Sequence, residues 1–238
     1  MHNESSLHRT SRFQDYLGEF VYGSIDGSVT TFAVVAGAAG ADLPISTVLI
    51  LGFANLLADG FSMSVGAYLS SRSERDTYEK HRRIEYQEVE DIPEMEREEI
   101  RQIYRAKGFE GELLEQVVSV ITADKDRWVD VMMKEELEMV PDHKSPLGMA
   151  AVTFSAFVTV GLVPLAAYLF NAGGGLPPGR LFAISCVFTS LAFLFIGWLK
   201  ARVTQTNYLK AIAETLFLGG SAAAVSYVVG DLLEKLLG

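Results

Sequence analysis

The chain has 238 residues, is 49% hydrophobic and still carries a formal net charge of −10. Nucleic-acid binding needs a basic surface, so this acidic balance argues against a nucleic acid as partner. The single cysteine, Cys186, excludes a disulfide framework and any cysteine-based zinc site. Residues 1–16 are polar and lack an apolar core, so we expect no cleavable signal peptide.

Charge and hydrophobicity occupy different parts of the chain. Of the 30 Asp and Glu residues, 21 lie between Arg72 and Lys144, and the flanking stretches are apolar for long runs. The sequence therefore predicts an all-α, polytopic membrane protein in three segments. Membrane parts at residues 1–71 and 144–238 enclose an inserted acidic helical domain at residues 72–143.

Five stretches meet or nearly meet the roughly 20 apolar residues that a membrane-spanning helix needs. They lie at about 20–40, 46–70, 147–170, 180–199 and 210–230. The third and fourth are the most apolar, whereas the first contains Asp26 and the second contains Asn55 and Asp59. The fifth is rich in Gly, Ala and Ser, a composition that favours close helix packing in lipid.

Lys and Arg in the connecting loops predict the orientation, because they favour the cytoplasmic side. The N-terminal arm, the long segment after the second stretch and the loop after the fourth all carry them. The loop after the first stretch has none, and the loop after the third has one. We therefore expect the N-terminus and the inserted domain to be cytoplasmic and, with five spans, the C-terminus to be outside.

The inserted segment reads as four helical stretches, at about 72–91, 94–107, 110–121 and 124–140. We expect the second membrane helix to continue past Tyr68 into the first of these without a break. Pro93 favours a new helix start and Gly108 favours a helix end.

Polar residues inside the apolar stretches are candidates for a transport pathway, because a carboxylate in lipid is costly and usually functional. Asp26 lies in the first stretch. In the second stretch Asn55, Asp59 and Met63 fall at i, i+4 and i+8, which places them on one helical stripe. Oxygen ligands beside a thioether suit a borderline metal such as Fe²⁺ better than Na⁺ or Mg²⁺.

Glutamates in the inserted segment form a second candidate set. Glu85 and Glu88 are spaced i, i+3, as are Glu96 and Glu99, so that each pair shares one helix face. A turn at Pro93 would bring the pairs together, and the last helix would add Met132, Met133 and Glu136. Carboxylates between facing helices bind iron or manganese in helical bundles. Glutamate-rich helices are also commonly solvated faces, so spacing alone leaves both interpretations open.

Four segments resemble the vacuolar iron transporter family of plants, yeast and bacteria. They are SIDGSVTTFAVVAGAAGA, GFSMSVGAYLSSRSERDTYE, WVDVMMKEELEM and GLVPLAAYLF, and the similarity runs from about Gly18 to Gly230. The resemblance implies five transmembrane helices per subunit, a homodimer with the path at its interface, and a cytoplasmic metal-binding domain. It implies Fe²⁺ export from the cytosol in exchange for protons.

The resemblance also implies roles for individual residues. The membrane aspartate and methionine of the family fall on Asp26 and Met63. The domain ligands of the family fall on Glu85, Glu88, Glu96, Glu99, Glu136, Met132 and Met133. The plant-type members carry a glutamate at the position of Asn55, and here a carboxylate appears one turn later, at Asp59. If the charge has not moved along the stripe, the ion or the proton coupling differs.

Several alternatives remain open at this stage. A di-iron oxidase would need Glu-x-x-His pairs, which the inserted segment lacks, so we expect no enzyme and no prosthetic group. A transporter for Mn²⁺, Zn²⁺ or Co²⁺ would use overlapping ligands. A metal sensor or store would bind without flux. The expected partners are a lipid bilayer, a second subunit, metal ions and protons, and the expected location is a bacterial inner membrane.

Overall fold

The computed structural model describes residues 15–171 and 175–237. Every regular element in these ranges is an α-helix, which confirms the all-α prediction. Contacts divide the chain into two compact units. The first, called the bundle unit here, runs to Leu69 and resumes at Lys144; the second, the acidic unit, is Ser70–His143.

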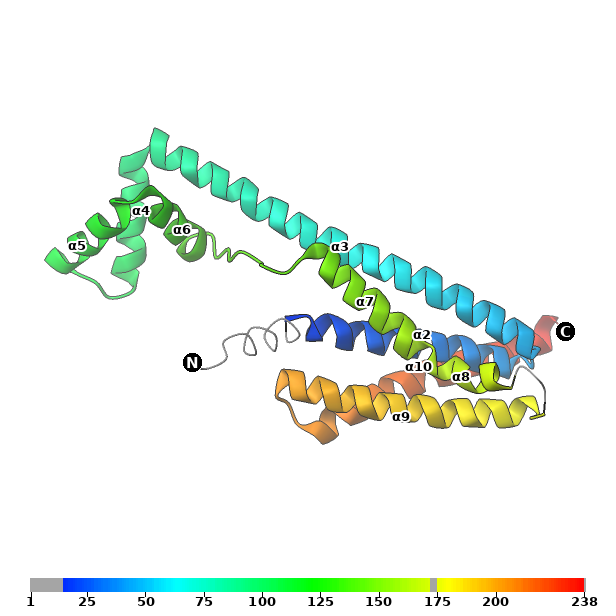
Figure 1. Cartoon of the computed structure of the whole chain (residues 1–238). Coiled ribbons are helices and arrows are strands. Elements are labelled where there is room, and N and C mark those ends of the chain that lie inside the picture. Colours follow the sequence, from blue (N-terminus) through cyan, green and yellow to red (C-terminus); the bar gives the residue numbers. More distant parts are fainter. Residues whose placement is uncertain (1–14, 172–174, 238) are drawn as a thin grey trace, which may run out of the picture. The chain divides into compact units, whose positions relative to one another are not determined.

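The bundle unit is arranged around one helix, α2 (Leu17–Gly40). This helix packs against α7, α8, α9 and α10 (Figure 1). Those helices are α7 (Pro146–Gly161), α8 (Val163–Phe170), α9 (Pro178–Thr204) and α10 (Tyr208–Leu237). The first part of α3 (Ile45–Asp91) completes the unit.

Three helices in the described ranges, α3, α9 and α10, are long and apolar enough to cross a membrane. The pair α7 and α8 is bent by 45° at its junction and counts as a fourth if it is one span. The central helix α2 does not qualify, although it has 24 residues. It carries Ser24, Ser28 and Thr31 on its buried face, where neighbouring helices rather than lipid surround it. The fifth predicted span therefore stays a prediction.

The bend between α7 and α8 has a local cause, since Pro164 has no N–H to continue the helix ladder. The carbonyl of Val160, which such an N–H would reach, accepts instead from the Ser28 hydroxyl at 3.4 Å. The Ser185 hydroxyl donates to the Pro164 carbonyl at 2.6 Å. Hydroxyl groups on neighbouring helices thus satisfy backbone groups that an apolar surrounding would leave unpaired.

Small residues let the helices of the bundle unit approach closely. A Cβ at Gly27 would lie 2.4 Å from the Phe157 carbonyl oxygen on α7, and one at Gly230 would lie 2.1 Å from the Gly37 oxygen on α2. Backbone therefore meets backbone at both contacts, as is common between helices in membranes.

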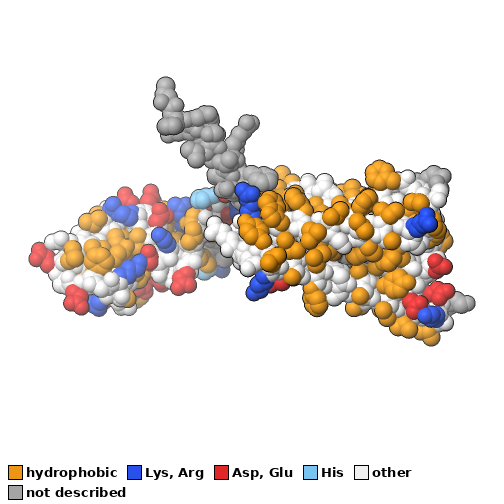
Figure 2. Space-filling model, turned by 90° about the horizontal axis from the view of Figure 1, so that it is seen from below, with side chains coloured by type: hydrophobic (Ala, Val, Ile, Leu, Met, Phe, Trp, Pro, Cys, Tyr) orange, Lys and Arg blue, Asp and Glu red, His pale blue; other side chains and the backbone are white. Residues whose placement is uncertain are grey.

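The surface of the bundle unit is largely hydrophobic (Figure 2). Phe61 on α3 is 65% exposed and Phe217 on α10 is 78% exposed. Exposed apolar surface of this extent suits contact with lipid or another subunit. The acidic unit instead carries both acidic and basic side chains on the face that Figure 2 shows.

The acidic unit contains the second part of α3 and three shorter helices, α4 (Pro93–Ala106), α5 (Gly111–Thr122) and α6 (Lys125–Glu135). The prediction that the second membrane helix continues into this segment is confirmed, because α3 is unbroken over 47 residues. Apolar side chains from all four helices form one core, among them Val89, Ile100, Val118 and Trp128.

The predicted end of the last helix at residue 140 is wrong, because α6 ends at Glu135. Glu138 adopts a left-handed φ of 52°. The N–H of Met139 then donates to the Met133 carbonyl at 2.8 Å. The left-handed turn at Glu138 folds the chain back onto the helix end, and because Gly usually provides such a turn the sequence did not reveal it.

Candidate functional site

The acidic unit brings the predicted glutamates within electrostatic reach of one another. Glu85 and Glu88 come from α3, Glu96 and Glu99 from α4, and Glu136 directly follows α6. Pro93 occupies the first turn of α4, where its missing N–H is tolerated. Glu85 is repelled by Glu136, Glu88 and Glu99, and Glu96 is repelled by all four of the others.

Two of these carboxylates are buried without a partner. Glu85 is 4% exposed and Glu96 is 3% exposed. The Oε2 atom of each is buried and accepts no hydrogen bond. Glu88 and Glu99 are half-buried, and Glu136 is exposed. A buried carboxylate that lacks a donor or counter-charge costs free energy, so folding alone gives no reason for these two positions.

Burial and mutual repulsion both favour the protonated form of these groups. Burial, followed by repulsion from Glu136 and other acids, raises the pKa of Glu85 to about 7. Burial, followed by repulsion from Glu99 and the other acids, raises the pKa of Glu96 to about 7. The pKa values of Glu99 and Glu136 are raised as well, first by partial loss of hydration beside the neighbouring helices and then by repulsion from nearby acids. A bound cation would reverse the repulsion.

Other acids in the same unit do have basic partners. Glu90 pairs with Lys125, and Glu135 pairs with Lys107. Arg101 contacts Glu98 and donates to Glu115 at 2.7 Å. In the described part of the chain, none of the five predicted ligand carboxylates forms an ion pair with Lys or Arg. Within the same part of the chain, Glu94 and Glu112 also lack an ion pair but are exposed, so it is burial without a partner that sets Glu85 and Glu96 apart.

The unpaired carboxylates do not converge on a single point. Among the described residues, no group of three or more His, Cys, Asp or Glu side chains is arranged to hold one metal ion. The two predicted thioethers, Met132 and Met133, are 0% and 1% exposed and lie in the apolar core beside Trp128 and Val129. Core packing accounts for their burial, and their role as ligands stays a prediction.

The second predicted set lies on α2 and α3 of the bundle unit. Asp26 is half-buried on α2, and its backbone carbonyl accepts from the Thr30 hydroxyl at 2.8 Å. Asp26 and Asp59 are close enough for their carboxylates to interact electrostatically. Asp59 is exposed and Met63 is half-buried, one turn apart on α3. The Nδ2 atom of Asn55 is buried and donates no hydrogen bond. Of this set, the structure thus brings Asp26 and Asp59 near each other.

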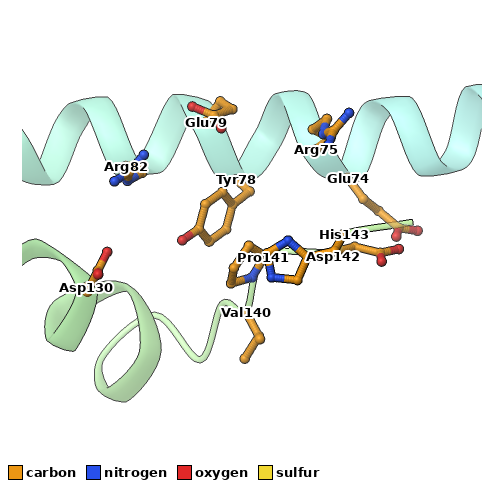
Figure 3. A pocket seen from close by; sticks show the side chains of 10 residues that line it. All are labelled: Glu74, Arg75, Tyr78, Glu79, Arg82, Asp130, Val140, Pro141, Asp142 and His143. Carbon is orange, nitrogen blue, oxygen red and sulfur yellow. The ribbon is translucent and has the colours of Figure 1, made fainter. Parts of the chain in front are cut away.

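A pocket in the acidic unit was not foreseen from the sequence. It has a volume of about 360 Å³ and is lined by residues of α3, by Asp130 of α6 and by residues 140–143 (Figure 3). Its charged side chains are of both signs: Arg75, Arg82, Glu74 and Glu79 come from α3, and Asp130 comes from α6 (Figure 3). The lining residues lie some 60 positions apart in the sequence, so no local pattern could have indicated it. Because the charges are mixed, the pocket favours no ligand of one sign.

Apolar helices of spanning length together with an acidic helical unit define a multi-pass membrane protein. Residues 17–231 match the model of the VIT family, and the chain belongs to that family. It is 37% identical over 235 residues to a vacuolar iron transporter of Toxoplasma gondii, covering 96% of this chain and 78% of the relative.

Plant relatives are similar over comparable lengths. The identity is 31% to vacuolar iron transporter 1 of Tulipa gesneriana, covering 93% of this chain and 88% of the relative. It is 32% to vacuolar iron transporter 1 of Arabidopsis thaliana, covering 91% and 85%. The predicted family is therefore confirmed. Its members are transporters, in agreement with the prediction that the chain is not an enzyme.

Proposed function

We propose that this chain transports Fe²⁺ out of the cytosol across the membrane that holds its bundle unit. The names of the relatives support iron as the ion. The observation that carries the proposal is the set of glutamates in the acidic unit that lack basic partners, two of them buried. A divalent cation would supply the missing positive charge. For the carboxylates of the i, i+3 pairs to bind one cation together, their side chains would have to rotate toward it. Met132 or Met133 would be softer ligands for the same ion.

The path through the membrane would use Asp26, Asp59, Asn55 and Met63. Asp59 is exposed on α3 between Leu57 and Phe61, which are 53% and 65% exposed. A carboxylate on such a surface is costly in lipid, whereas a second copy of the chain would cover it and double the number of ligands. This supports a homodimer with the path at its interface. In the proposed topology α2 is the fifth span, shielded from lipid by its neighbours.

Exchange with protons is the proposed driving force. A carboxylate binds either a metal ion or a proton, so protons from outside would compete at Asp26 or Asp59 and release the metal there. The acidic unit would collect the ion on the cytoplasmic side. Asn55 in place of the family glutamate makes Asp59 the acid that would carry this competition on α3.

Mn²⁺ is the second candidate ion, because carboxylate oxygens bind both metals. A sensor or store without flux is the second candidate role, since the unpaired glutamates lie in a unit of their own. The bacterial inner membrane stays a prediction, and the relatives named above are vacuolar proteins of eukaryotes by name.

Transport into sealed vesicles tests the proposal. We would reconstitute the full chain and follow Fe²⁺ and Mn²⁺ with and without a pH gradient. The test variant is Asp26→Asn, and the matched control is Asp231→Asn, which removes an acid of α10 that pairs with Lys235. Gradient-dependent Fe²⁺ flux that is lost only in Asp26→Asn supports the exporter. Binding without flux in the parent would establish the sensor or store instead.

A further inference from the structure

A second cavity lies within the bundle unit, at the end where α2 ends and α3 and α9 begin. Its volume is about 190 Å³, far more than the roughly 10–15 Å³ that one water needs and less than the roughly 300–1,000 Å³ of drug-sized sites. None of the residues predicted for metal transport lines it. The cavity therefore fits a small group and is separate from the proposed path.

The lining combines one formal charge with aromatic rings. Asp42 is the only charged side chain that lines the cavity, and its carboxylate makes no ion pair or hydrogen bond in the described ranges. Tyr168 is 2% exposed, and its hydroxyl has no hydrogen-bond partner there either. Phe182 stacks on Tyr227 with ring centroids 5.7 Å apart. A tyrosine hydroxyl that lines a cavity and has no protein partner can bind a polar group of a ligand.

The backbone holds Asp42 at the rim. Asp42 has a left-handed φ of 49° directly after α2. The N–H groups of Asp42 and Leu43 donate to the carbonyls of Ala39 and Ala38, at 3.3 and 2.9 Å. Asp and Asn tolerate this conformation better than other side chains with a Cβ. The turn that ends the helix thus places Asp42 at the cavity, where its side chain is exposed.

The helix ends around the cavity add little net charge. The C-terminal ends of α2 and α8 carry partial negative charge, and the N-terminal ends of α3 and α9 carry partial positive charge. With two ends of each sign, the opposing dipoles nearly cancel. The carboxylate of Asp42 therefore sets the preference of the cavity, which is for a cation of single charge.

We propose that this cavity binds an alkylammonium group. One carboxylate balances one ammonium, whereas Ca²⁺ takes six to eight oxygen ligands and Mg²⁺ six. The rings of Tyr168 and Tyr227 and the apolar side chains of Leu43 and Val48 suit the carbon atoms next to the nitrogen. Tyrosines at the end of spanning helices lie at headgroup level. The favoured source is the headgroup of phosphatidylethanolamine, and a soluble amine has the same chemistry.

Lipid retention by the full-length protein tests the proposal. We would record native mass spectra of the protein in mild detergent with equal amounts of phosphatidylethanolamine and phosphatidylglycerol of identical acyl chains. The parent should prefer the ethanolamine lipid by about tenfold, the order expected of a hydrogen bond to a charged group. Asp42→Asn should abolish this preference, and Asp231→Asn should keep it. Tyr168→Phe, which removes only the hydroxyl, should reduce it by about threefold.

Thermal unfolding of the delipidated protein separates the two sources. We would compare ethanolammonium chloride with sodium chloride at equal ionic strength, in the parent and in Asp42→Asn. Stabilisation by ethanolammonium that depends on Asp42, without any lipid preference, assigns the cavity to a soluble amine. If neither lipid retention nor ethanolammonium stabilisation changes in Asp42→Asn or in Tyr168→Phe, the proposal is wrong. The second variant keeps this test decisive should the first fail to fold.

Discussion

The two units bury polar groups of different chemical kinds. In the bundle unit, the hydroxyls of Ser28 and Ser185 are buried and donate to backbone carbonyls near a helix bend. In the acidic unit, the buried carboxylates of Glu85 and Glu96 each retain an oxygen without any partner. The first kind of burial stabilises the fold, and the second costs free energy. Ser24, Thr31 and Thr189 of the bundle unit also bury hydroxyls without a partner in the described ranges, but an unpaired carboxylate costs more free energy than an unpaired hydroxyl, so it is the better indicator of function.

Packing differs between the units as well. The bundle unit relies on glycines where helix backbones touch, as at Gly230 and Gly37. The acidic unit relies on an apolar core of larger side chains, including Ile100 and Trp128, with ion pairs at its surface. A substitution that disturbs a backbone contact should therefore lower the free energy of unfolding more than any single change of charge does.

The largest effect is expected from Gly230→Ala. The new Cβ would meet the Gly37 carbonyl oxygen at 2.1 Å, which rigid backbone cannot accommodate without a shift of α10 against α2. We expect a loss of about 3 kcal/mol in the free energy of unfolding, typical of severe overpacking. Thermal unfolding in detergent measures it. Gly220→Ala on the same helix is the control, because no atom lies within 4 Å of its Cβ. Equal melting temperatures for the two variants would show that the contact between Gly230 and Gly37 leaves room for a methyl group.

The next effect concerns the pH dependence of metal binding. Glu85 and Glu96 have pKa values of about 7 and must lose their protons to bind a cation. Between pH 8 and pH 6 we expect the affinity for Fe²⁺ to fall about tenfold for each group that must deprotonate. Anaerobic calorimetry on the full chain measures this. In the double variant Glu85→Gln, Glu96→Gln the remaining affinity should depend less on pH, through Glu99 and Glu136, whose pKa values are also raised. If the unmutated protein binds Fe²⁺ with the same affinity from pH 6 to pH 8, Glu85 and Glu96 are not ligands of the ion.

Glu85→Gln alone should stabilise the acidic unit in the absence of metal. The pKa of Glu85 is raised from 4.5 to about 7 in the folded chain. Between these values the folded state holds a proton that the unfolded state has lost, so stability falls as pH rises through this window and stays low above it. The variant should gain about 2 kcal/mol at pH 8, less than the roughly 3 kcal/mol of an isolated group, and nothing at pH 4.

Fluorescence of Trp128 reports this gain, because Trp128 lies in the core of the acidic unit. Urea unfolding would be followed in a Trp198→Phe background, so that one tryptophan remains. Glu90→Gln is the control, since Glu90 is exposed and paired with Lys125. A loss of stability in Glu85→Gln at pH 8 would mean that the charged carboxylate has a stabilising partner after all.

Local pattern predicted much of this architecture. Apolar runs gave the positions of α3, α9 and α10, and Pro93 gave the start of α4 to within one residue. The i, i+3 spacing identified glutamates that the structure brings within mutual reach. These features depend on residues near one another in the chain, where periodicity and turn chemistry act directly.

Features that depend on distant residues could not be predicted. The bend at Pro164 is accommodated by Ser28 and Ser185, which lie on other helices. The cavity beside Asp42 forms only where four helix ends meet. Whether a given glutamate has a basic partner also depends on tertiary contacts, as the pair of Glu90 and Lys125 shows across 35 positions. Spacing therefore selected the candidates, and only the fold separated paired from unpaired acids.

The smallest effect is expected from breaking one of the surface pairs. Lys125→Met keeps most of the side-chain length but removes the ammonium, which pairs with Glu90 and lies 5.3 Å from the centre of the Tyr86 ring. The side chains of Lys125 and Glu90 are 36% and 69% exposed, so water and salt screen their attraction. We expect a loss of about 0.5 kcal/mol at low salt, shrinking further in about 0.5 M NaCl, by the same Trp128 assay. A loss near 2 kcal/mol that persists at high salt would mean that paired glutamates also determine the stability of the acidic unit. Burial without a partner, as at Glu85 and Glu96, would then be the feature that still distinguishes the metal-binding candidates from acids that serve the fold.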